Sequence, residues 1–133
     1  MIYFVDTSAF VALGNRDDQW HGAAEKFNRN LHSRDRFITT NYVVDETITR
    51  IRMTAGLKSA LDFGKSLFSS KIIQITYVDE NLERLAFELL KKYQEHPLSF
   101  TDCTSFALMS ALGIKAAFTI DQHFRKVGFQ VFP

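Results

Sequence analysis

Short runs suited to β-strands alternate along this chain with longer segments of helical periodicity, and this order limits the folds that it can adopt. The first run, residues 2–5, is continuously apolar, as in strands buried on both faces of a parallel sheet. Four further runs predict strands at residues 36–40, 72–78, 116–120 and 129–132. The alternation predicts an α/β fold, a three-layer α/β/α domain with a mainly parallel five-stranded sheet.

Helical patterns fill the intervals between these runs. N-cap oxygens precede a predicted helix over residues 7–13, and an apolar stripe predicts a second helix, with its buried face formed by Trp20, Ala23, Ala24, Phe27 and Leu31. Further helices are predicted up to Gly56, over 57–68, from residue 82 to His96, and over 100–112. The last of these is apolar nearly all round, which indicates burial on more than one side.

The length and the cysteine content favour one domain in a reducing compartment. A chain of 133 residues can bury a sufficient core without disulfides, so residues 1–133 are expected to form a single domain. Cys103 is the only cysteine and is expected in the core, which suits a cytoplasmic location. Asp6 interrupts the apolar amino terminus, so no signal peptide is expected, and no apolar run is long enough to span a membrane.

Charge and motifs exclude several classes of function. Sixteen Lys and Arg against fifteen Asp and Glu leave a net charge of +1, so any contact with nucleic acid must be local. The chain has no Gly-rich phosphate loop, no nucleophile elbow, and no His or Cys pair at zinc-ligand spacing. Nucleotide-binding, acyl-transfer and zinc-dependent functions therefore have no support.

Several carboxylates are predicted to lie beyond the carboxyl ends of the strands, where parallel sheets bind their ligands. Asp6 and Asp121 each follow a strand run directly, and Asp102 lies in the first turn of the apolar helix. Each has a structural alternative, since acidic residues also cap helices and favour first turns. Asp79 is interpreted in that way, because it simply precedes the most regular helix.

Helical periodicity does not select Glu46, and local sequence does not decide the role of His123. At 100° per residue, Glu46 faces away from the apolar stripe of its helix, where an exposed pair with Arg50 four residues later is the simpler interpretation. His123 could contact phosphate or lie in a loop, and the loop is favoured.

Four segments together resemble the PIN-domain nucleases, specifically the small VapC-type toxins of toxin–antitoxin pairs. They are residues 2–8, 40–46, 98–103 and 118–124, and the resemblance extends over the whole chain. It implies a catalytic and metal-binding set consisting of Asp6, Glu46, Asp102 and Asp121. It also implies supporting hydroxyls from Thr7, Ser8 and Thr101, whereas Asp45 and Asp79 match no position of the family.

The resemblance further implies the chemistry and the partners. The expected activity is hydrolysis of RNA phosphodiester bonds by an Mg²⁺- or Mn²⁺-dependent endoribonuclease, acting on structured RNA such as transfer or ribosomal RNA. A homodimer and a small antitoxin protein are expected as partners. The helix hairpin of residues 48–68, with Met53 and Leu57, is a candidate for part of the antitoxin groove.

Three other functions stay open from the sequence. One is a PIN nuclease for RNA maturation without an antitoxin, and another is a non-catalytic RNA-binding module on the same scaffold. The third is a phosphoacceptor signalling domain with Asp79 as acceptor. That class has paired acids after the first strand, whereas Thr7 and Ser8 follow Asp6 here.

Overall fold

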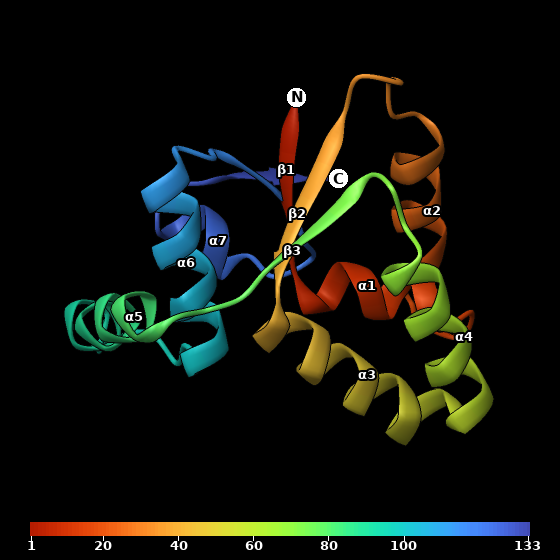
Figure 1. Cartoon of the computed structure of the whole chain (residues 1–133), viewed down its shortest axis with the longest axis horizontal. Coiled ribbons are helices and arrows are strands. Elements are labelled where there is room, and N and C mark those ends of the chain that lie inside the picture. Colours follow the sequence, from red (N-terminus) through yellow and green to blue (C-terminus); the bar gives the residue numbers. More distant parts are fainter.

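The computed structural model describes residues 1–133, in which a five-stranded sheet carries helices on both faces (Figure 1). Every strand pair is parallel, and the strand order is β3-β2-β1-β4-β5. The strands are β1 (Ile2–Val5), β2 (Arg36–Thr40), β3 (Ile73–Thr76), β4 (Ala116–Phe118) and β5 (Gln130–Phe132). The predicted three-layer α/β architecture is confirmed.

Seven helices connect the strands and form the outer layers. They are α1 (Thr7–Gly14), α2 (His21–Arg29), α3 (Asn41–Ala55), α4 (Leu57–Phe68), α5 (Glu80–Lys92), α6 (Phe100–Leu112) and α7 (His123–Lys126). Figure 1 shows α5, α6 and α7 on one side of the sheet and α1, α2 and α4 on the other. Helix α3 packs against both α1 and α4. No helix combines the length and the apolar character of a membrane span.

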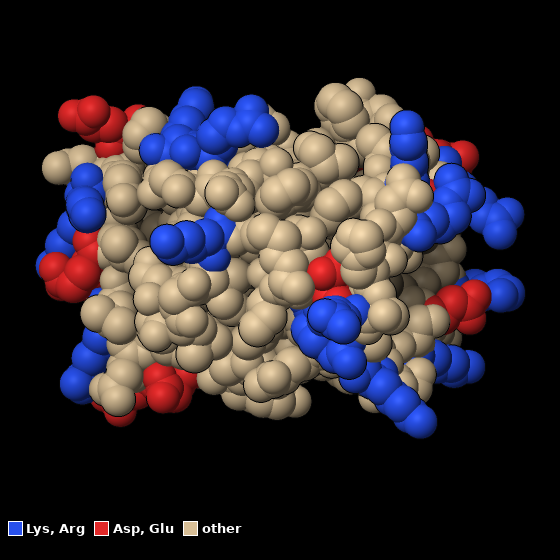
Figure 2. Space-filling model, turned by 90° about the horizontal axis from the view of Figure 1, so that it is seen from above, with Lys and Arg blue, Asp and Glu red and all other residues tan.

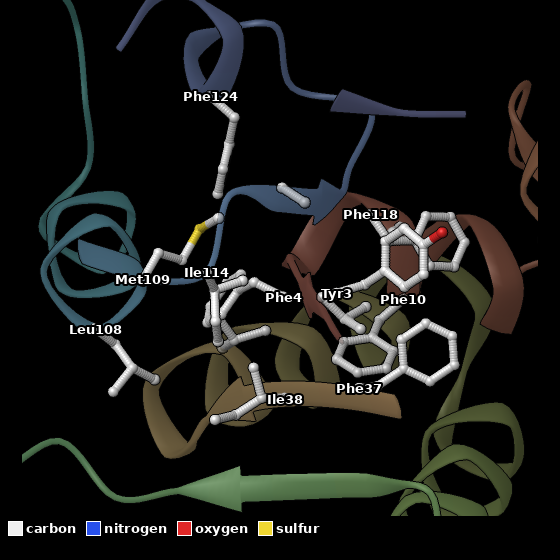
Figure 3. Close-up of a cluster of buried hydrophobic side chains, with 14 of the residues drawn as sticks. Tyr3, Phe4, Phe10, Phe37, Ile38, Leu108, Met109, Ile114, Phe118 and Phe124 are labelled. Atoms are coloured by element: carbon white, nitrogen blue, oxygen red, sulfur yellow. The ribbon is translucent and has the colours of Figure 1, made fainter. Parts of the chain in front are cut away.

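Alternating side chains of β1 build a core on each face of the sheet. The ring of Tyr3 lies 5.4 Å from that of Phe27 in α2, whereas the ring of Phe4 lies 6.3 Å from that of Phe124 in α7. Figure 3 shows the two groups, with Phe124 and Met109 apart from Phe10 and Phe37. Burial on both faces explains why the central strands are continuously apolar.

Three sequence predictions about local structure are wrong. Helix α5 ends at Lys92 rather than His96, because Pro97 disfavours helical geometry before it and the chain turns between Tyr93 and His96. Trp20 precedes α2 as its N-cap and is 47% exposed, so the apolar stripe of that helix does not include it, and Ala23 is exposed as well. His123 begins the short helix α7 instead of lying in a loop.

Candidate active site

Asp6 and Thr119 lie side by side where the two central strands β1 and β4 end. Val5 pairs with Phe118 in the sheet, and the Asp6 N–H donates to the Phe118 carbonyl at 3.1 Å. Asp6 is also the N-cap of α1, so the strand turns into the helix at this residue. Only 3% of Asp6 is exposed, which leaves a carboxyl group almost fully buried at the edge of the sheet.

Two hydroxyls hold one oxygen of the Asp6 carboxylate. The Ser8 Oγ and the Thr119 Oγ1 both donate to Oδ2, each at 2.9 Å, and the Ser8 N–H lies 3.4 Å from the same oxygen. The other oxygen, Oδ1, accepts no side-chain hydrogen bond, and it is not among the buried polar atoms that lack a partner. Asp6 therefore keeps one oriented oxygen free for a ligand.

The same two hydroxyls accept backbone N–H groups from the segment after β4. The Ser8 Oγ accepts from Ile120 and the Thr119 Oγ1 accepts from Asp121, both at 2.9 Å. Thr119 thus fixes Asp6 and Asp121 at once, although the sequence analysis did not select it. Its only sequence signal is a hydroxyl at the end of an apolar run, two residues before an aspartate.

Asp102 enters the site from the start of α6. Its Oδ2 accepts the Ser99 N–H at 3.0 Å, and the Ser99 Oγ accepts the Asp102 N–H at 3.0 Å, which forms a capping box. Residues 103–109 of this helix are all buried, as its apolar pattern predicted. A helix held so firmly fixes the position of the carboxylate at its first turn.

Burial and mutual repulsion raise the pKa of two of these carboxyls. Burial, and then the negative charge of Asp102, raise the pKa of Asp6 to about 6, against the hydrogen bonds from Thr119 and Ser8. Burial also raises the pKa of Asp102, and the charges of Asp121 and Glu46 act on it in the same direction. All four predicted carboxylates are therefore linked electrostatically through Asp102.

Asp121 is oriented by the histidine that follows it. Its Oδ1 accepts the His123 N–H at 2.9 Å and lies 2.8 Å from the His123 Nδ1. The His123 ring in turn lies 6.4 Å from that of His96. Like Asp6, Asp121 uses one oxygen within the protein and keeps the other, Oδ2, without a hydrogen bond.

Glu46 stands at the rim of the site rather than in full solvent. It is 26% exposed, and its Oε2 lies 3.9 Å from the Arg50 Nη2, so the expected pair four residues apart forms only weakly. Its charge acts on Asp102, which indicates that it faces the same region. The neighbouring Asp45 is exposed, and Asp79 caps α5 through the Leu82 N–H at 2.9 Å.

The donor set fits a hard divalent cation, although no three Asp, Glu, His or Cys side chains form a group that could hold one in their present positions. The free oxygens of Asp6, Asp102 and Asp121 are of the kind that Mg²⁺ and Mn²⁺ prefer. Mg²⁺ retains several waters, so carboxylates can hold it through water as well as directly. A cation would also relieve the repulsion that raises the two pKa values.

The predicted supporting hydroxyls have three different environments. Ser8 contacts Asp6 directly, as described above. Thr7 is 2% exposed and its Oγ1 is buried without a hydrogen-bond partner. Thr101 lines a pocket of about 270 Å³ with Asn41, Tyr42 and Asp45. A second small pocket, of about 240 Å³, begins at Ser8 and Asp121.

Comparison with known proteins identifies the family. The PIN domain family model matches residues 3–130. The 23S rRNA-specific endonuclease VapC20 of Mycobacterium tuberculosis (strain CDC 1551 / Oshkosh) is 35% identical over 126 residues, which cover 95% of this chain and 94% of that protein. A VapC ribonuclease of Archaeoglobus fulgidus is 31% identical over 81 residues, covering 60% of this chain and 51% of the relative.

Solved structures agree with the sequence match. The crystal structure of Mycobacterium tuberculosis VapC20, described as a Sarcin-Ricin loop cleaving toxin, matches with a TM-score of 0.91 and covers 100% of both chains at 35% identity. VapBC2 from Rickettsia felis matches with a TM-score of 0.73 at 13% identity and covers 98% of this chain and 97% of that one, which supports the fold alone. This chain belongs to the PIN-domain family, and the relatives that it matches over nearly its whole length are VapC ribonucleases.

Proposed function

We propose that this protein is an endoribonuclease that hydrolyses RNA phosphodiester bonds at Asp6, Glu46, Asp102 and Asp121, with Mg²⁺ or Mn²⁺ as its cofactor, and that it acts as the toxin of a toxin–antitoxin pair. The observation that carries the proposal is the buried carboxyl of Asp6. Its pKa is raised to about 6 beside Asp102, yet one of its oxygens stays free. PIN-domain nucleases generally depend on divalent metal, which agrees with such a site.

The side chains of this protein hold and aim the ligand oxygens. Asp6, Asp102 and Asp121 provide the inner oxygens, and Glu46 provides one at the rim. When bound, a divalent cation supplies charge neutralisation at the phosphate and lowers the pKa of a bound water. Ser8 and Thr119 keep Asp6 in one orientation. Thr7 and Thr101 are proposed as further supporting hydroxyls. Rigid orientation of this kind is what a metal site needs from the residues behind its ligands.

The proposed substrate is structured RNA. Ribosomal RNA is favoured over transfer RNA, because the relative VapC20 is named a 23S rRNA-specific endonuclease. The experiment incubates the protein with total RNA and with a hairpin that carries the sarcin–ricin loop, in Mn²⁺, Mg²⁺ or chelator. Metal-dependent cutting that disappears in an Asp102→Asn variant supports the proposal. Cutting that continues in chelator, or that the variant retains in full, contradicts it.

Thr119 and Thr47 offer a test in which the same substitution has opposite effects. Thr119→Val removes a hydrogen bond from Asp6 and leaves the Asp121 N–H without its acceptor, so we expect a loss of about 1–3 kcal/mol in unfolding free energy and slower cleavage. Thr47 is fully buried and its hydroxyl has no partner, so Thr47→Val is expected to be neutral or stabilising. Thermal unfolding and cleavage rates measure both. If the two variants have the same stability and the same cleavage rate, Thr119 has no special role in the site.

The proposed antitoxin binds the helix hairpin of residues 48–68. Helices α3 and α4 border a cavity of about 850 Å³, which none of the four carboxylates lines. Met53 and Leu57 do not line it either but lie on the outer surface, 80% and 50% exposed. Such apolar exposure is typical of a protein interface.

Replacing Met53 and Leu57 together by Glu is expected to weaken antitoxin binding at least about tenfold, because two apolar contacts become charged. The measurement is titration with the product of a small reading frame next to the gene. Leu112→Glu, at a site of similar exposure on α6, is the control. If the double variant binds as tightly as the control, the hairpin is not the docking site.

The protein is also proposed to form a homodimer. Light scattering of the purified chain is then expected to give twice the monomer mass of 15.3 kDa. A single species at the monomer mass across micromolar concentrations would contradict this part of the proposal.

A further inference from the structure

A small pocket continues the acidic site on the side of Asp121, and the proposed hydrolysis does not explain it. It has a volume of about 240 Å³ and shares Ser8 and Asp121 with the site. Its other lining residues are Val11, Asp18, Trp20, Arg50 and Ile120. An aromatic ring, two aliphatic side chains and one cation therefore lie next to the carboxylates.

The backbone of Trp20 is fixed although the residue is half exposed. The Trp20 N–H donates to the Asp18 Oδ1 at 2.8 Å, and its carbonyl accepts the Ala24 N–H at 3.0 Å. The His21 Nδ1 lies 2.6 Å from the Ala12 carbonyl and ties the start of α2 to α1. A tryptophan that is 47% exposed on a backbone held in this way offers a surface for stacking.

Arg50 is the one basic residue that lines this pocket. Its distance of 3.9 Å to Glu46 and its exposure of 57% make that ion pair weak. The guanidinium is thus available to another anion, and its geometry suits phosphate. It lies one helical turn from Glu46, so a phosphate paired with it would stand beside the acidic site.

The low net charge makes a local contact of this kind important. The net charge is only +1, and the face at the amino ends of the strands, opposite the site, carries Lys and Arg in separate groups (Figure 2). A continuous basic track is what usually holds an RNA backbone. With so little net charge the protein has little general attraction for RNA, so stacking and single phosphate contacts near the site gain importance.

We propose that this pocket binds one unpaired nucleotide of the RNA substrate beside the cleaved phosphate, with its base stacked on Trp20 and its phosphate paired with Arg50. The inference rests on the proposed function. The volume lies just below the ~300–1,000 Å³ of small-molecule sites, which suits a single base and leaves the sugar and phosphate at the rim. A base can stack there only if it is splayed from its helix, so the preferred substrate has a loop or bulge at the cut.

The binding test uses Trp20 itself, because it is the only tryptophan and its fluorescence reports on the stacking ring. The full-length Asp102→Asn variant is titrated with a short single-stranded RNA and with the same RNA in a duplex, while a dye on the RNA reports binding separately. We expect saturable quenching by the single strand and several-fold weaker quenching by the duplex. Dye-reported binding that leaves the tryptophan signal unchanged would overturn the inference.

Arg50 has a matched control on the same helix. Arg50→Ala is expected to weaken the binding and to reduce its dependence on salt by about one phosphate contact. Arg52→Ala removes the same charge two residues away and is expected to change neither. Equal effects of the two variants would show that Arg50 contributes only general charge, and would overturn its assignment.

Cleavage kinetics separate this inference from the proposed function. Trp20→Ala is expected to raise KM by about 5- to 150-fold, the range of one lost base stack, and Trp20→Phe to restore most of it. Phe87→Ala removes an aromatic ring of similar exposure on α5 and is expected to leave KM unchanged. If Trp20→Ala has the KM of the wild type, the nucleotide-binding inference is wrong, while the proposed nuclease activity still stands. A wild type that cuts no RNA refutes the nuclease, and the quenching titration then decides the pocket alone.

Discussion

Replacing Asp6 by asparagine is expected to lower the rate of RNA cleavage by about 100- to 1,000-fold, since several kcal/mol of metal-assisted stabilisation depend on the charge of the ligands. An asparagine oxygen can still accept the hydrogen bonds of Ser8 and Thr119, so the fold is expected to remain. What the substitution removes is the negative charge beside Asp102. Initial rates at saturating Mn²⁺ measure the effect.

Asp79→Asn is the matched control for this experiment. Asp79 also follows a strand and caps a helix, through the Leu82 N–H at 2.9 Å, but it has no contact with the acidic site. Asparagine is as good an N-cap as aspartate, so stability and cleavage are both expected to stay at the wild-type level. Equal losses in the two variants would mean that helix capping, and not the charge of Asp6, supports the activity.

Asp6→Asn is also expected to stabilise the protein at neutral pH when metal is removed. The pKa of Asp6 is about 6 in the folded protein and 3.8 when unperturbed, so the folded state binds the proton more tightly. The stability from this group is complete below pH 3.8 and is lost as the pH rises to about 6, by about 3 kcal/mol. Asparagine does not titrate, so in chelator the variant should match the wild type near pH 4 and exceed it by about that amount at pH 7.

Added metal should remove most of this difference. Mn²⁺ at 100 times its Kd stabilises a folded protein by about 2.7 kcal/mol, and the effect should be large for the wild type and small for Asp6→Asn. Urea unfolding at pH 4 and pH 7, with and without Mn²⁺, measures all the differences without any use of activity. If the difference in unfolding free energy between Asp6→Asn and the wild type in chelator is the same at pH 7 as at pH 4, burial and Asp102 do not destabilise the charged carboxyl of Asp6.

The fold was predictable because its signals are local and repeated. Apolar runs for buried strands and the glycine at residue 56 are read directly from the chain, and the structure follows them closely. Trp20 was misplaced because periodicity does not show where a helix begins. Helix α7 was missed because four residues are too few to display a helical period.

The site was predictable only where position along a strand decides it. Asp6 and Asp121 follow buried runs, and parallel strands place such residues at one edge. Glu46 was selected by family resemblance alone, since the angle around its helix favoured solvent. Thr119 had no usable signal, because its importance comes from a hydrogen bond to Asp6, 113 positions away in the sequence, and from a contact with Ser8, 111 positions away.

The contact between Ser8 and Thr119 joins the beginning of the chain to its end, at 3.0 Å across 111 residues. It lies just beyond the ends of the neighbouring strands β1 and β4, and inner strands are usually the last part of a sheet to open. Any fluctuation that parts these strand ends also releases the side chains that aim Asp6. Heat or denaturant should therefore abolish activity and central-strand amide protection together, so that no partly melted form of this protein remains active.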